Sequence, residues 1–191
     1  YPLAPHTTVK IGGPAEVFCD VKNSDDFVSL VTFAIKEDIP LTILGLGSNT
    51  LISDAGIRGL VIKNSAREIK VLENQTAKTS EDNDEKSSNP EKIAPRFHSD
   101  KDKGSFKYEF TDLEYDESDK PTVSVEIDAG TPLPFAINIL LNQGVTGLQW
   151  YSRIPSTIGG GIYNNIHGGT HFISETIESV KVIDEQGNVK I

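Results

Sequence analysis

The chain has 191 residues, enough for one domain of ordinary size or two small ones. Its 28 acidic and 18 basic residues give a formal charge of −10, which argues against a nucleic-acid-binding surface. Hydrophobic residues make up 37% of the sequence, few for a globular domain, so part of the chain is expected to lie outside any core.

Cys19 is the only cysteine, which excludes an intramolecular disulfide and is typical of a reducing compartment, so we expect a cytoplasmic protein. No stretch approaches the roughly 20 apolar residues that span a bilayer, and no signal-peptide pattern opens the chain. The sequence has no methionine and ends on GNVKI, which is typical of the middle of a strand after a turn. We therefore expect both ends to be trimmed.

The first 72 residues predict an α/β unit. Residues 15–21 (AEVFCDV) alternate as in a half-buried strand, with Val17, Cys19 and Val21 on its inward face and Cys19 as an unreactive buried thiol. Residues 23–39 have helical spacing of apolar side chains, with Ser24 as the expected N-cap. Short buried strands are expected at residues 41–45 and 59–64, and a helix between strands with short joints is typical of α/β architecture.

Residues 73–121 are polar and charged. Residues 79–104 lack apolar periodicity and are rich in Ser, Asn, Asp, Glu and Lys. Such a composition cannot offset its ordering entropy, so we expect a disordered insertion between two strands of one sheet, with a docking loop or lid as the alternative. An amphipathic strand at residues 107–116 would end the insertion.

Residues 122–191 are apolar again and rich in glycine. A strand is expected from residue 122, followed by a turn at Ala129–Gly130 and an amphipathic helix over residues 133–145 that ends at Gly144. A long glycine-rich loop with a small helix near residues 157–162 comes next. Residues 176–191 predict two strands joined by a turn at residues 185–188.

Two glycine clusters indicate a binding site. The first, LGLGSNT at residues 44–50, follows a predicted buried strand, and glycine allows backbone N–H groups to turn toward an anion. The Gly47 position is expected to lack a Cβ because the anion approaches there. The segment of residues 44–50 is neither a Walker loop nor a dinucleotide fingerprint. Taken alone, it is equally consistent with a tight structural turn. The second, Gly159–Gly161, is flanked by apolar residues, which indicates an ordered loop packed against something flat or backbone-like.

Four segments together resemble the UDP-N-acetylenolpyruvoylglucosamine reductase family, flavoenzymes that make UDP-N-acetylmuramate for peptidoglycan. The segments are TTVKIGGPA (7–15), LGLGSNTLISD (44–54), IDAGT (127–131) and GLQWYSRIPSTIGGGIYNNIHGG (147–169). They occur in the order and approximate spacing of the family, and the resemblance skips the acidic insertion.

The resemblance implies an α+β fold in which two small α/β subdomains of the p-cresol-methylhydroxylase type bind FAD. It divides the chain into a first subdomain (1–72), an acidic insertion (73–121) within the second, and the rest of the second (122–191). The Gly-x-Gly-Ser-Asn loop would bind the pyrophosphate. The implied FAD-binding residues are Leu44, Gly45, Leu46, Gly47, Ser48, Asn49, Thr50, Ala129, Gly130, Ile154, Pro155, Ser156, Thr157, Gly159, Gly160, Gly161, Tyr163, Asn165 and Ile177.

The implied reaction is reduction of a nucleotide-sugar enolpyruvyl ether by NADPH through FAD. The family's catalytic Arg, Ser and Glu would lie beyond Ile191, so no catalytic residue is expected in this chain. Ser156 and the stretch His167–Gly169 depart from the family pattern and affect the expected flavin environment. Another FAD-linked oxidase or dehydrogenase of the same fold, or a flavin-binding module without turnover, are the alternatives.

Other candidate residues have simpler interpretations. His167 and His171 lie four residues apart but lack enough neighbouring ligands for a metal site, so no metal is expected. His167 is expected to be a hydrogen-bonded loop residue, with a flavin contact or a covalent flavin link as alternatives. Arg153 is either a phosphate contact or a surface residue, and Trp150 and Tyr151 are expected to line the cleft.

Overall fold

A three-stranded parallel sheet organises the first part of the chain. Its strands are β1 (Ala15–Val21), β2 (Leu41–Leu44) and β3 (Ile57–Asn64), in the order β1-β3-β2. The computed structural model describes residues 1–72 and 122–191, and all of these except Thr122 belong to one compact unit. The predicted insertion and the strand expected at residues 107–116 lie outside the described residues.

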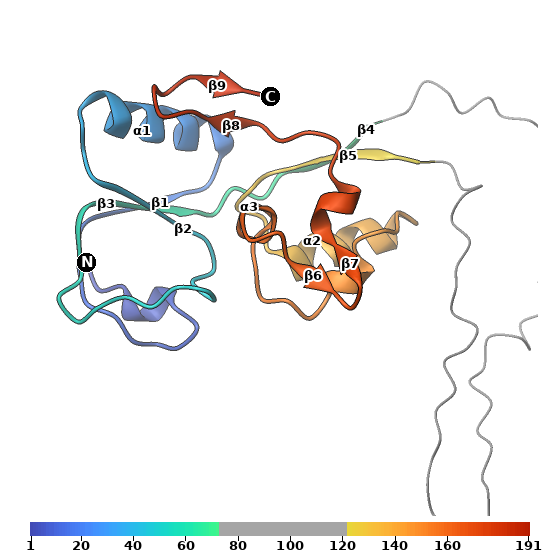
Figure 1. Cartoon of the computed structure of the whole chain (residues 1–191), viewed down its shortest axis with the longest axis horizontal. Coiled ribbons are helices and arrows are strands. Elements are labelled where there is room, and N and C mark those ends of the chain that lie inside the picture. The colour runs from blue at the N-terminus through green and yellow to red at the C-terminus, as the bar shows by residue number, and fades with distance from the viewer. Residues whose placement is uncertain (73–121) are drawn as a thin grey trace, which may run out of the picture. The chain divides into compact units, whose positions relative to one another are not determined.

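Helix α1 (Ser24–Lys36) covers one face of this sheet (Figure 1). Val31 and Ala34 pack there against Leu60 and Ile62 of β3. The predicted N-cap was wrong by one residue, because the Asn23 side chain accepts a hydrogen bond from the Asp26 N–H. Ser24 instead donates to Asp128 Oδ1 at 2.6 Å, which ties the start of α1 to the second half of the chain.

The N-terminal segment covers the other face of the sheet. It contains the 3-10 helix η1 (Ala4–His6), and its Leu3 is fully buried among Leu44, Ile52 and Val61. Strand β1 therefore contributes side chains to both faces. The prediction that Val17 points inward was wrong, since it is 54% exposed, and the half-buried Phe18 packs on the N-terminal side instead. Cys19 is free and half-buried against the α1 side.

The second half pairs β4 (Ile69–Leu72), which the sequence pattern did not predict, with β5 (Ser124–Ile127) in antiparallel register. Helix α2 (Leu133–Asn142) follows, and its buried side chains form a core with η3 (Gln149–Tyr151) and α3 (Ile158–Tyr163). Gly144 stops α2 with a φ of +74°, as predicted. The predicted small helix is confirmed, with Thr157 as its N-cap.

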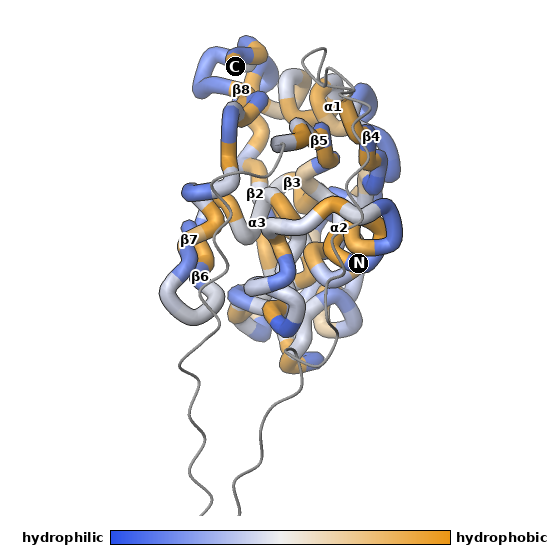
Figure 2. Tube along the Cα trace, turned by 90° about the vertical axis from the view of Figure 1, so that its right-hand side faces the viewer, coloured by the Kyte–Doolittle hydropathy of each residue, from blue (hydrophilic) through white to orange (hydrophobic). Residues whose placement is uncertain are grey.

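The chain ends in two short hairpins joined by η4 (Ile173–Thr176): β6 (His167–Gly168) with β7 (His171–Phe172), and β8 (Val182–Ile183) with β9 (Val189–Lys190). The predicted turn after β8 is confirmed and is largely hydrophilic in Figure 2. Asp184 fixes this turn by accepting from Asn188 N–H and Lys190, contacts that lower its pKa to about 2. Ile183 packs beside α1, and Thr32 donates to Gly187 O.

No helix within residues 1–72 or 122–191 has both the length and the apolar character needed to cross a bilayer.

Candidate functional site

The two glycine clusters meet at the carboxyl end of the parallel sheet. Gly45, directly after β2, lies against the cap of α3, so that a Cβ there would be 2.8 Å from Thr157 Oγ1. Asn49 Nδ2 donates to Asn164 Oδ1 at 3.1 Å, which joins the same two segments a second time. Ligands of open α/β sheets bind at this end of the strands, so the position agrees with a binding site.

The turn at Ala129–Gly130 completes this junction. A Cβ on Gly130 would lie 2.3 Å from Asn64 Oδ1, at the end of β3, and a Cβ on Gly159 would lie 2.9 Å from Ala129 Cβ. The Asp128 carboxylate holds the turn in place by accepting from Ser24 Oγ and from Glu68 N–H at 2.8 Å. We call the contacts among residues 45, 64, 129–130 and 157–159 the glycine junction.

The loop of residues 45–50 has unpaired backbone donors. Among the described residues, none accepts a hydrogen bond from its N–H groups, whereas Thr8 N–H donates to Gly47 O. Consecutive N–H groups without protein acceptors form the kind of concave donor set that binds anions. Ser48 and Asn49 are exposed beside it. These N–H groups therefore have no protein acceptor in the described structure that a bound anion would have to replace.

The α3 end of the junction has its donors already paired. Ile158 N–H donates to Thr131 O, Gly159 N–H to Ala129 O, and Gly160 N–H to Thr157 Oγ1. Gly161 is buried against Ile166. These glycines therefore bring the segment close to the turn, and the free donors lie on the 45–50 side.

Gly47 is a glycine for a different reason than the sequence suggested. Its φ is +66°, and a Cβ would lie 2.2 Å from His6 O and 2.9 Å from Thr7 Cα. The expectation that the missing Cβ faces the anion was therefore wrong: it faces the backbone of the N-terminal segment. This close contact uses none of the N–H groups of the loop.

The other predicted site residues divide into exposed and structural positions. Tyr163 is 90% exposed, and Ala129 is also exposed. Leu44, at the end of β2, is buried in the core beneath the N-terminal segment. Ile154 and Ile177 pack against the core that contains α2. Asn165 has a φ of +43° and its Oδ1 accepts from Ser174 N–H. The remaining predicted positions, all of them partly or fully exposed, are Leu46, Thr50, Pro155 and Ser156.

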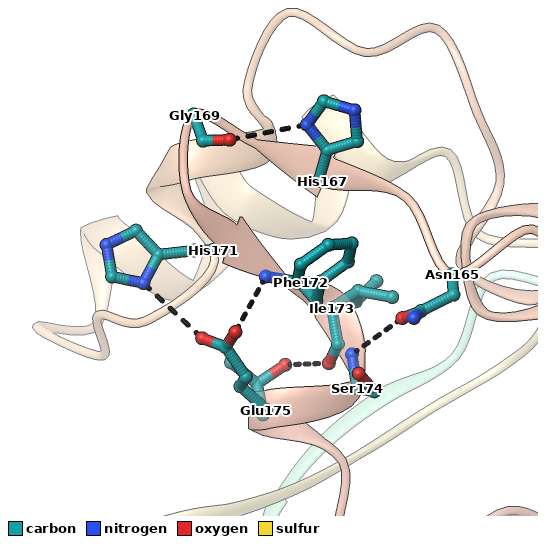
Figure 3. A network of polar contacts seen from close by, with 9 residues as sticks. Asn165, His167, Gly169, His171, Phe172, Ile173, Ser174 and Glu175 are labelled. Atoms are coloured by element: carbon teal, nitrogen blue, oxygen red, sulfur yellow. Dashed lines mark hydrogen bonds and ion pairs between the residues drawn. The ribbon is translucent and has the colours of Figure 1, made fainter.

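The histidines of the β6–β7 hairpin make contacts of their own (Figure 3). His167 Nδ1 lies 3.3 Å from Gly169 O, and His171 Nδ1 lies 3.4 Å from the Glu175 carboxylate. His171 also stacks on Trp150, with ring centroids 4.4 Å apart. Within residues 1–72 and 122–191, no group of three potential metal ligands comes together. Arg153 is exposed.

Tyr151 is fully buried rather than lining a cleft, and its hydroxyl has no hydrogen-bond partner in the described structure. Burial raises the pKa of this hydroxyl, with a smaller contribution from the Glu175 charge. Because an unpaired buried hydroxyl costs about 1–3 kcal/mol, we expect Tyr151→Phe to stabilise the fold by about 1 kcal/mol in urea unfolding. Trp150→Phe, at a half-exposed ring, is the control that should not stabilise. A destabilised Tyr151→Phe variant would show that the hydroxyl has a partner.

Sequence reasoning missed one feature near the loop, a group of basic side chains. It found only scattered Lys and Arg pairs, but the fold brings Lys63 Nζ to 3.3 Å from His6 Nδ1, and Lys10 close enough to lower the pKa of His6. These residues come from separate segments. The only sign of this group in the local sequence was Lys63, near the end of the strand predicted at residues 59–64.

Comparison with known proteins identifies relatives of the chain. Residues 109–191 match the family model described as FAD binding domain. UDP-N-acetylenolpyruvoylglucosamine reductase of Caldanaerobacter subterraneus subsp. tengcongensis is 27% identical over 190 residues, covering 100% of this chain and 47% of that protein. The enzyme of the same name from Lachnoclostridium phytofermentans is 29% identical, with 98% and 47% covered. The chain thus spans about half the length of the curated relatives it matches.

A solved structure confirms the expected fold. The crystal structure of UDP-N-acetylenolpyruvylglucosamine reductase from Thermus caldophilus superposes with a TM-score of 0.59 at 20% identity, covering 100% of this chain and 50% of that one. The expected α+β class and FAD as cofactor are confirmed by these matches. The chain is thus similar to proteins named UDP-N-acetylenolpyruvoylglucosamine reductase over about half of their length, and its residues 109–191 match the model of an FAD binding domain.

Proposed function

We propose that this chain is the FAD-binding part of a UDP-N-acetylmuramate dehydrogenase and that the loop of residues 45–50 binds the FAD pyrophosphate. The observation that carries the proposal is the set of backbone N–H groups in that loop, which have no acceptor among the described residues. A pyrophosphate supplies several anionic oxygens to such a donor set. The relatives' names and the FAD binding domain match support the same cofactor.

The residues of the glycine junction bring the loop and the second half of the chain together around the cofactor. Residues 1–72 would supply the pyrophosphate loop, and residues 122–191 the turn at Ala129–Gly130 and the segment from Ile154 to Gly161. Thr131 Oγ1, at the same junction, is buried without a partner in the described structure. The acidic segment 73–121 would be an insertion within the second subdomain.

Bound FAD would supply hydride transfer from NADPH to the enolpyruvyl group of a nucleotide-sugar substrate, in peptidoglycan synthesis in the cytoplasm. The residues of this chain would bind and orient the cofactor. Exposed Tyr163 lies next to Asn164, which bonds the pyrophosphate loop, and would limit solvent access at that side of the site. The catalytic acid and the residues that stabilise the enolate would come from outside this chain.

Binding of flavins tests the proposal directly. We expect the purified protein to be yellow and to release free FAD on denaturation, or to take up added FAD with quenching of flavin fluorescence. Riboflavin, which has the ring but no phosphate, is the matched control and should bind far more weakly. A protein that takes up no FAD, or that binds riboflavin as tightly as FAD, would refute the pyrophosphate assignment.

A further inference from the structure

The basic side chains that the sequence pattern did not reveal lie on the N-terminal face of the sheet. Lys63, near the end of the central strand β3, donates from Nζ to His6 Nδ1 at 3.3 Å. Because Nδ1 accepts, the ring proton is on Nε2, which lies 3.3 Å from Tyr1 OH. The ring of His6 also packs at 4.8 Å over Phe18, which stacks on Tyr1. The imidazole is thus fixed on both nitrogens and on one face.

His6 holds Lys63 without neutralising it. Burial, followed by the charge of Lys63, lowers the pKa of His6, which keeps the imidazole neutral near pH 7. Among the described residues, no carboxylate lies within 4.0 Å of Lys63 Nζ, and this includes Asp20, its register partner on β1. The Lys63 ammonium group therefore has no carboxylate ion-pair partner in the described structure and has further N–H donors besides the one that bonds His6.

The N-terminal segment that carries His6 contacts the loop with the unpaired N–H groups. Lys63 is the register partner of Leu44 on β2, one residue before that loop, and neighbouring strands lie about 4.8 Å apart. His6 O lies against Gly47, and Thr8 N–H donates to Gly47 O at 3.1 Å. The segment that carries His6 therefore also contacts the loop, and Lys63 lies one strand spacing from the residue that precedes the loop.

We propose that Lys63 is a phosphate-binding side chain of this site, with His6 as the residue that positions its ammonium group. This rests on the proposed function, in that the anion is the pyrophosphate of FAD. A charge-assisted contact adds to backbone donors an attraction that depends on salt. The ligand class that the two residues recognise is a dinucleotide or nucleoside diphosphate rather than the uncharged isoalloxazine ring.

Fluorescence titration with FAD and with riboflavin, each at 50 and 300 mM NaCl, tests the proposal. Lys63→Gln keeps a hydrogen-bond donor and removes the charge. We expect it to weaken FAD binding about tenfold or more, to reduce the salt dependence, and to leave riboflavin binding unchanged. Lys63→Arg should retain part of the affinity. His6→Phe keeps the ring packing, so it should lose affinity several-fold while retaining the salt dependence.

Lys36→Gln is the matched control, since it removes the same charge at the far end of α1 and should leave the Kd for FAD unchanged. If the wild-type protein takes up no FAD, the proposed function fails. If it takes up FAD and Lys63→Gln binds FAD equally well, only the role of Lys63 is refuted. If Lys63→Gln lost FAD binding and riboflavin binding equally, Lys63 would have a purely structural role, and its assignment as a phosphate-binding side chain would be refuted. Lys63→Arg keeps the test decisive if Lys63→Gln unfolds.

Discussion

Gly47→Ala is expected to lower the free energy of unfolding by about 3 kcal/mol or more, with or without FAD. The left-handed φ of +66° costs an L-residue about 1–2 kcal/mol. The added Cβ would also meet His6 O at 2.2 Å, a clash with backbone that can be relieved only by moving the loop or the N-terminal segment. Urea unfolding of the protein without added cofactor measures this cost.

Gly144→Ala separates the two causes. Gly144 has a similar φ, +74°, but a Cβ there would have nothing within 4 Å. The free energy of unfolding of this variant should therefore fall only by the cost of the backbone conformation, about 1–2 kcal/mol. The difference between the two variants is the cost of displacing the His6–Thr7 backbone. Equal losses in both would contradict the close contact between Gly47 and the N-terminal segment.

The sequence was most informative where local chemistry decides structure. The strand β1, the helix α1, the stop at Gly144 and the turn after β8 all follow from short-range rules, and the structure has each of them, although the burial of β1 does not alternate as expected. The cap of α1 was misplaced because Asn23 and Ser24 are both good caps, and the choice between them depends on Asp128, more than a hundred residues away.

The sequence predicted which segments form the site, but it did not predict which residues of those segments contact one another. Glycine clusters indicate where the backbone comes close to another part of the protein or to a ligand, but tertiary packing decides which residue each glycine contacts. Gly45 contacts Thr157, Gly130 contacts Asn64 and Gly47 contacts His6, three pairs that no local pattern joins. The His6–Lys63 pair was missed for the same reason, since it links the N-terminal segment to the third strand of a parallel sheet.

Asn49→Asp is expected to weaken FAD binding strongly while changing the stability of the protein without FAD very little. The new carboxylate would stand beside unpaired N–H groups and would repel a bound pyrophosphate, by about 3–4 kcal/mol per charge pair at 4–5 Å in a medium of effective dielectric 20. Solvent screening at this exposed position reduces that, and we expect a loss of FAD affinity of about a hundredfold. Without FAD, the variant loses the hydrogen bond from Asn49 Nδ2 to Asn164 Oδ1, but its carboxylate can accept from the N–H groups of the loop, so we expect little change in thermal stability.

Two controls make that result specific. Asn49→Ala removes only the 3.1 Å hydrogen bond to Asn164 and should weaken FAD binding less than tenfold. Gln186→Glu adds the same charge in the turn between β8 and β9 and should leave the Kd unchanged. Equilibrium titration and thermal unfolding of all three variants give the comparison. If Asn49→Asp bound FAD as well as Asn49→Ala does, the anion would not lie at this loop, because no dianion next to a new carboxylate escapes its repulsion. An Asn49→Asp protein that is less stable without FAD than Asn49→Ala, which loses the same hydrogen bond, would show that the N–H groups of residues 45–50 are not open to an acceptor.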